Sequence, residues 1–271
     1  MRIGFLSDGP SSVLPAAAGI VAAVDDLATQ PWLDRLSGAF AHDAPPDVGG
    51  PVIWAVLLAT VILCVPRRTW RYFGLFTTVV HELGHAFAAL ISGQRLRSIV
   101  LRLDHSGTTT SVSRGGWRPV WSGFWGYPAP GVVGAALVTS GFAGWGSAAL
   151  GVGALVAAAS LVFIRNGAGV LITVVCAGTG AAIVLVAPAG ATGYVALVLG
   201  LALLVGSIRA FLGLVSVHTR HRERLPTSDA HLLAVATHLP AAVWLLLFAC
   251  TIGASSLVAW LQLQPILVPG V

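Results

Sequence analysis

Seven apolar runs follow one another after residue 50, and they leave few folds open to this chain. The runs cover roughly 51–66, 73–92, 128–147, 149–164, 168–187, 191–217 and 239–262. A helix needs about 20 apolar residues to cross a bilayer, so the first and fourth runs are marginal and the others are long enough. We therefore predict an all-α polytopic membrane protein with six or seven transmembrane helices.

The composition supports this fold class and excludes several others. Of the 271 residues, 56% are hydrophobic and only 9% are charged, which leaves no soluble domain for binding nucleic acid. The expected surroundings are the lipid bilayer. The three cysteines each lie alone in an apolar stretch, so they are interpreted as small buried side chains and not as a redox or metal motif.

The first fifty residues differ from the rest of the chain. They contain six of the ten acidic residues and end in the turn-rich sequence APPDVGGP. This pattern predicts an N-terminal surface segment over 1–50, with one short helix near 18–40, ahead of a membrane-embedded, metalloprotease-like domain over 51–271.

One stretch interrupts the helical pattern. Between residues 93 and 117, in GQRLRSIVLRLDHSGTTTSVSRGGW, polar and apolar residues alternate on both sides of a DHSG turn, and the TTTSV that follows is rich in β-branched residues. Alternation of this kind with a central turn predicts a small β-hairpin.

The arginines constrain the topology, because short loops rich in arginine usually face the cytoplasm. They cluster in 67–71, in the hairpin, at Arg165 and in 220–224. A complete crossing by residues 73–92 would place the first two clusters on opposite sides of the membrane. If residues 72–118 instead enter and leave the membrane on the same side, every arginine cluster faces the cytoplasm. Irregular backbone at membrane depth then requires a cavity beside residues 81–85.

Residues 77–92, TTVVHELGHAFAALIS, contain two histidines and a glutamate within an apolar helix. On a helix, His81 and His85 project from one face and both imidazoles can bind one zinc ion, while Glu82 lies beside the metal as a general base. Ionisable residues inside a membrane are expensive and usually functional, and here three occur within five positions. The segment therefore predicts a Zn²⁺ site and hydrolytic chemistry.

A zinc hydrolase keeps three protein ligands, so a third ligand is needed. The acids after residue 92 are Asp104, in the hairpin turn, Glu223, in the basic RHRER, and Asp229, in LPTSDAHLLAVATHLPAAVW. Local sequence supports two roles for Asp229 equally, a metal ligand or the N-cap of a helix. His231 and His238, seven residues apart on the same predicted helix face, are the rival ligands.

Two further polar residues lie within or beside apolar runs. Arg209 stands alone in the sixth run, where it either pairs with a carboxylate or extends its side chain toward the membrane surface. Asn166, in FIRNGAG, is assigned an ordinary loop role, with polarisation of a substrate carbonyl as the alternative.

These motifs together resemble the site-2 protease superfamily of intramembrane zinc metalloproteases, and more closely its largely uncharacterised bacterial branch. The resemblance covers about residues 70–250, and it rests on HELGHAFAALISGQRL, DHSGTTTS, GYPAPGVVGAAL and TSDAHLLAVATHLPAAVW in that order. The better-known members place their aspartate in an LDG or NPxPxxDGG context, and this chain has TSDA instead.

The resemblance implies zinc held by His81, His85 and Asp229, with Glu82 as general base. It implies an integral protein of the bacterial cytoplasmic membrane, with its site toward the cytoplasmic side, that hydrolyses a peptide bond in a membrane-embedded substrate. The alternative is a non-proteolytic scaffold or assembly partner of other membrane proteins, and a weaker one is an ion transporter. An intact Glu82 favours the protease, since a protein that only binds zinc needs no base beside it.

Overall fold

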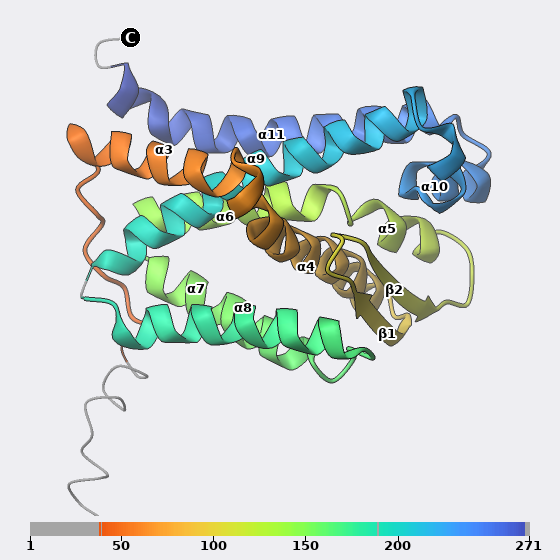
Figure 1. The fold of residues 1–271 in the computed structure, drawn as a ribbon, viewed down its shortest axis with the longest axis horizontal. Helices are drawn as coiled ribbons and strands as arrows, with labels where there is room; N and C mark the ends of the chain where they lie inside the picture. Colours follow the sequence, from red (N-terminus) through yellow and green to blue (C-terminus); the bar gives the residue numbers. More distant parts are fainter. Residues whose placement is uncertain (1–37, 39, 189, 269–271) are drawn as a thin grey trace, which may run out of the picture.

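The computed structural model describes residues 38, 40–188 and 190–268, and these residues form a bundle of helices with one small hairpin (Figure 1). The elements in order are α3 (Pro51–Cys64), α4 (Arg67–Ile91), β1 (Arg95–Leu101), β2 (Gly107–Val112), α5 (Arg118–Phe124), α6 (Pro128–Phe142), α7 (Gly146–Ser160), α8 (Gly167–Val186), α9 (Ala191–Thr219), the 3-10 helix η1 (Arg222–Thr227), α10 (Asp229–Thr237) and α11 (Ala241–Leu267). Apart from its last residues, the predicted helix near 18–40 lies outside the described part of the chain.

Four of the described helices, α4, α8, α9 and α11, are long and apolar enough to cross a membrane. The helices α3, α6 and α7 are apolar but shorter, with 14 or 15 residues each. The chain is thus an all-α polytopic membrane protein with a small β-hairpin after the HELGH helix, as its sequence predicts.

The first two apolar runs form a helix pair that is broken at Pro66. Proline has no backbone N–H and fits poorly inside a helix, so α3 stops after 14 residues and α4 begins at Arg67. The hydroxyl of Thr69 donates to the carbonyl oxygens of Ile62 and Pro66 and closes the break. In Figure 1, α4 runs obliquely from the point where α3 ends toward the hairpin.

The structure places the 67–71 arginine cluster and the hairpin relative to each other, while the membrane side that each one faces stays a prediction. The 67–71 cluster lies at the junction of α3 and α4, part-way along the molecule, and not at the end where the hairpin strands open (Figure 1). What doubles back is the hairpin itself: His105, in its turn, lies with Nε2 3.1 Å from the carbonyl oxygen of Arg71. Residues 51–91 therefore advance in one direction, and the hairpin returns along α4.

The hairpin pairs β1 with β2 in antiparallel register from Arg95 opposite Val112 to Leu101 opposite Gly107, with one irregularity after Leu96. The outer edge of β1 is covered by the turn between α7 and α8. The amide of Ile99 donates to the carbonyl oxygen of Phe163 at 2.8 Å, and further contacts follow along the same edge. Because this edge is paired, β1 is held firmly against the bundle.

Small residues bring α6 and α9 into backbone contact. A Cβ added at Gly134 would lie 2.7 Å from the carbonyl oxygen of Gly200, and the reciprocal distance is also 2.7 Å. Only glycine fits at both positions, and small residues of this kind allow close helix contacts in lipid. Ser207 and Ile252 lie against Gly131 of α6, which brings α9 and α11 together.

The last apolar segment consists of two helices where the sequence predicts one. His238 has φ 60° and ends α10, and Pro240 precedes α11. A proline disfavours helical backbone in the residue before it, so the helix cannot run from 229 into 262. The predicted helix face shared by His231 and His238 is therefore wrong, because His238 lies outside the helix.

Candidate metal centre

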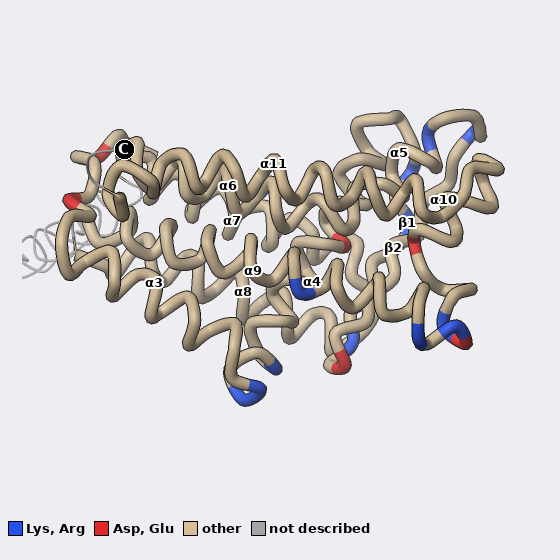
Figure 2. The backbone as a smooth tube through the Cα atoms, turned by 90° about the horizontal axis from the view of Figure 1, so that it is seen from above, with Lys and Arg blue, Asp and Glu red and all other residues tan. Residues whose placement is uncertain are grey.

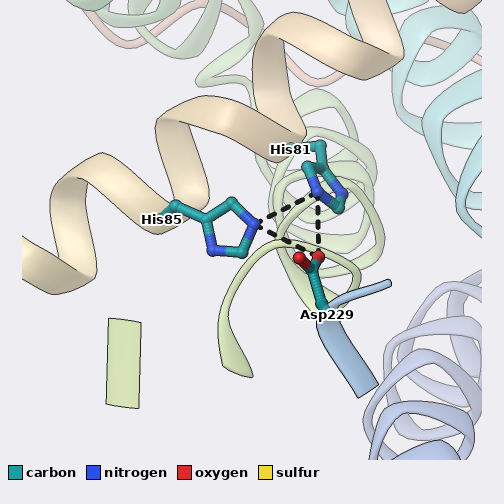
Figure 3. A group of neighbouring side chains, drawn as sticks. All are labelled: His81, His85 and Asp229. Carbon is teal, nitrogen blue, oxygen red and sulfur yellow. Dashed lines mark hydrogen bonds and ion pairs between the residues drawn. The ribbon is translucent and has the colours of Figure 1, made fainter. Parts of the chain in front are cut away.

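Helix α4 presents both histidines of the HELGH motif to one point. His81 and His85 are one turn apart, and their Nε2 atoms lie 3.2 Å from each other. Figure 3 shows both rings directed toward the same space beside the helix. Since α4 is continuous from Arg67 to Ile91, this spacing follows directly from the helical repeat.

Asp229 reaches the same point from the opposite side, at the first residue of α10. The N-cap of that helix is Ser228, whose side chain accepts from the amide of His231 at 3.2 Å. The carboxylate of Asp229 is therefore free of capping, and its Oδ2 lies 3.3 Å from Nε2 of His81 and 3.3 Å from Nε2 of His85 (Figure 3).

The three ligand atoms form a triangle that suits a zinc ion. Zn–N and Zn–O bonds of about 2.0–2.1 Å at tetrahedral angles separate neighbouring ligand atoms by about 3.3 Å, close to the 3.2 and 3.3 Å observed. Within the described residues this is the one group of three or more His, Cys, Asp or Glu side chains arranged to hold a metal. Neither His231 nor His238 belongs to it.

Contacts with the surrounding protein set the orientation of His85 and the charge of Asp229. His85 Nδ1 lies 2.7 Å from the carbonyl oxygen of Ser122, so a proton on Nδ1 leaves Nε2 free to act as a ligand. When the imidazoles are instead protonated, burial disfavours the charged form of Asp229, but the charge of His85 and hydrogen bonds from both histidines outweigh it and hold the pKa of Asp229 below its ordinary value. The carboxylate is thus kept in its ligating form.

Glu82 follows His81 on α4 and is held by the hairpin. Its side chain is buried, and the hydroxyl of Thr109 in β2 donates to its Oε2 at 2.6 Å and contacts its backbone oxygen at 3.1 Å. A Cβ added at Gly107 would lie only 2.3 Å from Oε1. The alternating pattern of residues 93–117 predicts the hairpin, but no local pattern indicates that β2 holds the glutamate.

The group lies in a partly polar cavity of about 890 Å³. Its walls come from α4, β2, the α5–α6 segment, α9 and α10, and His81, Glu82, His85 and Asp229 all line it. A cavity therefore lies beside residues 81–85, as the sequence analysis expected, although the re-entrant topology from which it was inferred stays a prediction. An open cavity leaves room for water and an extended substrate next to the three side chains.

Gly126 forms the floor beneath the two imidazoles, and its replacement is our first prediction. A Cβ there would lie 2.3 Å from Nε2 of His85 and 2.8 Å from Cε1 of His81. The variant Gly126→Ala is expected to displace both rings and to lower zinc affinity by about 10- to 100-fold, the range seen when the surroundings of metal ligands are disturbed. Zinc content after dialysis against graded zinc buffers measures the change.

The control is Gly213→Ala on α9, where an added Cβ meets no atom within 4 Å. It makes the same chemical change in the same protein and should keep wild-type zinc affinity. Equal losses in both variants would mean that the contact between Gly126 and the histidines is irrelevant.

Asn166 and Arg209, the two other polar residues noted in the sequence, lie outside the cavity of the candidate metal centre. The Asn166 side chain is occupied by the backbone of Leu101, accepting from its amide at 3.2 Å and donating to its oxygen at 2.6 Å. Arg209 donates to the carbonyl oxygen of Cys64 at 2.7 Å and lies 4.3 Å from the ring centroid of Trp70. Asn166 therefore has a structural loop role, and Arg209 joins α9 to the break between α3 and α4.

Comparison with known proteins was made at the levels of family, curated sequence and solved structure. The searches of curated proteins and of solved structures returned no match. A family model described as Peptidase M50B-like matches residues 53–259, from α3 into α11, and so spans His81, Glu82, His85 and Asp229. The chain therefore belongs to the Peptidase M50B-like family, within the site-2 protease superfamily.

Proposed function

We propose that this protein is an intramembrane zinc metalloprotease that hydrolyses a peptide bond in a membrane-embedded protein. The observation that carries the proposal is the triangle formed by His81, His85 and Asp229 at 3.2–3.3 Å, in a cavity that Glu82 also lines. A metal-binding scaffold needs the triangle alone, whereas peptide hydrolysis needs the base as well.

The chemistry divides between the metal and the chain. Zinc at such a site polarises a carbonyl group and makes a water molecule more acidic. Glu82 accepts the proton of the attacking water and delivers it to the leaving amide nitrogen. The hydroxyl of Thr109, which donates to Oε2, orients the carboxylate and leaves Oε1 to carry the proton.

The charge distribution supports a site on the cytoplasmic side of a bacterial cytoplasmic membrane. In Figure 2 most of the blue segments gather at the end of the molecule that holds the hairpin, α5 and α10. Arginine-rich loops favour the cytoplasm. The metal-binding group contains the first residue of α10 and therefore lies at this end (Figures 1 and 3).

Metal dependence provides the test of this proposal. Purified protein in lipid vesicles with a single-span model substrate is expected to cleave it, to lose activity after treatment with a zinc chelator, and to regain it when zinc is added back, because the metal site supplies the acidic water. Gel analysis of the substrate measures cleavage. Unchanged cleavage by protein shown to be free of zinc would overturn the assignment, and metal binding without cleavage of any single-span substrate would favour the scaffold.

A further inference from the structure

A second, larger cavity lies on the other side of α4. It encloses about 1080 Å³ between α4, α6, α7 and α8, and its lining is almost wholly apolar. The residues of α4 that line it, among them Thr69, Phe76, Val80 and Phe87, recur at helical spacing along one stripe. We refer to this cavity as the lateral groove.

The lateral groove is separate from the metal centre. The two cavities share no lining residue, and α4 lies between them. At Gly84 the helix touches α6 so closely that an added Cβ would lie 2.4 Å from Cβ of Ala129 and 2.4 Å from the oxygen of Trp125. A chain seated in the lateral groove therefore does not reach His81 or His85, which argues against a substrate segment as its occupant.

Positive charge lies beside the groove, in the first turns of α4. Arg67, Arg68 and Arg71 are exposed, and none of them takes part in the ion pairs found among the described residues. The guanidinium of Arg71 lies 5.3 Å from the ring centroid of Tyr72, and both Tyr72 and Thr69 line the groove. The first turn of α4 contains no acid. Figure 2 shows blue at this junction of α3 and α4, apart from the blue segments near the hairpin.

We propose that the lateral groove and the arginines beside it bind one anionic phospholipid, with its acyl chains in the groove and its phosphate on Arg67, Arg68 and Arg71. Arginine binds phosphate through paired hydrogen bonds, and a lipid phosphate supplies the counter-charge that exposed arginines beside an apolar surface lack. The apolar lining fits hydrocarbon, and the separation from His81 and His85 leaves the metal centre accessible.

Lipid binding to the purified protein in neutral detergent tests this. Native mass spectrometry compares phosphatidylglycerol with phosphatidylcholine for the wild type and for Arg67→Gln/Arg68→Gln/Arg71→Gln. The wild type is expected to prefer phosphatidylglycerol at least tenfold, since each arginine near an anionic headgroup contributes roughly fivefold, and the triple variant is expected to lose the preference. The matched control is Arg114→Gln/Arg220→Gln/Arg222→Gln, which removes the same charge from exposed positions elsewhere and should keep it.

A groove variant tests the acyl-chain part independently. Gly153 lines the groove, and a Cβ there meets no atom within 4 Å, so Gly153→Leu fills the space without a clash. This variant should lower the affinity for both lipids about fivefold or more, while the preference for phosphatidylglycerol over phosphatidylcholine persists.

Several outcomes would overturn the proposal. They are equal wild-type affinity for the two lipids, an equal loss in the control triple variant, unchanged binding in Gly153→Leu, and displacement of phosphatidylglycerol by millimolar inorganic phosphate, which would indicate a free-anion site. Crosslinking of a single-span substrate to a Gly153→Cys variant would show that the groove binds a protein segment and not a lipid.

Discussion

Replacing Glu82 by glutamine is expected to reduce substrate cleavage by about 100- to 10,000-fold, the contribution typical of a general acid–base residue, without loss of zinc. Glutamine keeps the size of the side chain and an oxygen that accepts from Thr109 Oγ1, which lies 2.6 Å from Oε2 in the wild type. It cannot take up the proton of the attacking water. Cleavage rate and zinc content, measured on the same preparation, separate the two effects.

The chain contains a matched control for this experiment, because its only other glutamate is Glu223. Glu223 is exposed in η1, pairs with His221 at 3.5 Å and does not line the cavity. Glu223→Gln should cleave at the wild-type rate. If Glu82→Gln also cleaved at that rate, the protease proposal would fail, and the scaffold would become the better account of the same fold.

Asp229→Ala is expected to lower zinc affinity by more than about 100-fold, beyond the 10- to 100-fold effect of disturbing residues around the ligands. The substitution removes the oxygen that lies 3.3 Å from both imidazoles and leaves two ligands where a zinc site needs three or four. Equilibrium dialysis with atomic absorption measures the affinity, and activity should fall in parallel.

His231→Ala and His238→Ala serve as comparisons, because the sequence offered both as rival ligands. Neither residue belongs to the metal-binding group, so both variants should keep zinc. The structure would be contradicted if His231→Ala released the metal and Asp229→Ala retained it.

Regular patterns made much of the fold predictable from sequence. The apolar runs predict the helices within a few residues, and the alternation around DHSG predicts the hairpin. Breaks inside apolar sequence were harder to recognise. Pro240 stands beside a long hydrophobic stretch, and hydrophobicity alone does not show where a helix stops. For this reason the end of α10 differs from expectation.

Half of the metal centre could be derived from local sequence and half could not. The spacing of His81 and His85 places both on one helix face in any α-helix. The role of Asp229 depends on which neighbour caps α10, and TSD allows either reading until Ser228 is seen to accept from the amide of His231. Gly107 and Gly126 matter only because segments distant in sequence approach them, and such approaches have no local signature.

The distance along the chain between the ligands has a consequence for biosynthesis. Asp229 follows His85 by 144 residues, which take about 7 to 30 s to synthesise at 5–20 residues per second. During that interval the nascent chain has the HELGH helix and the hairpin, but it lacks the carboxylate that completes the triangle. The candidate metal centre cannot assemble until α10 has emerged, so a partly made chain has no complete set of ligands for a metal.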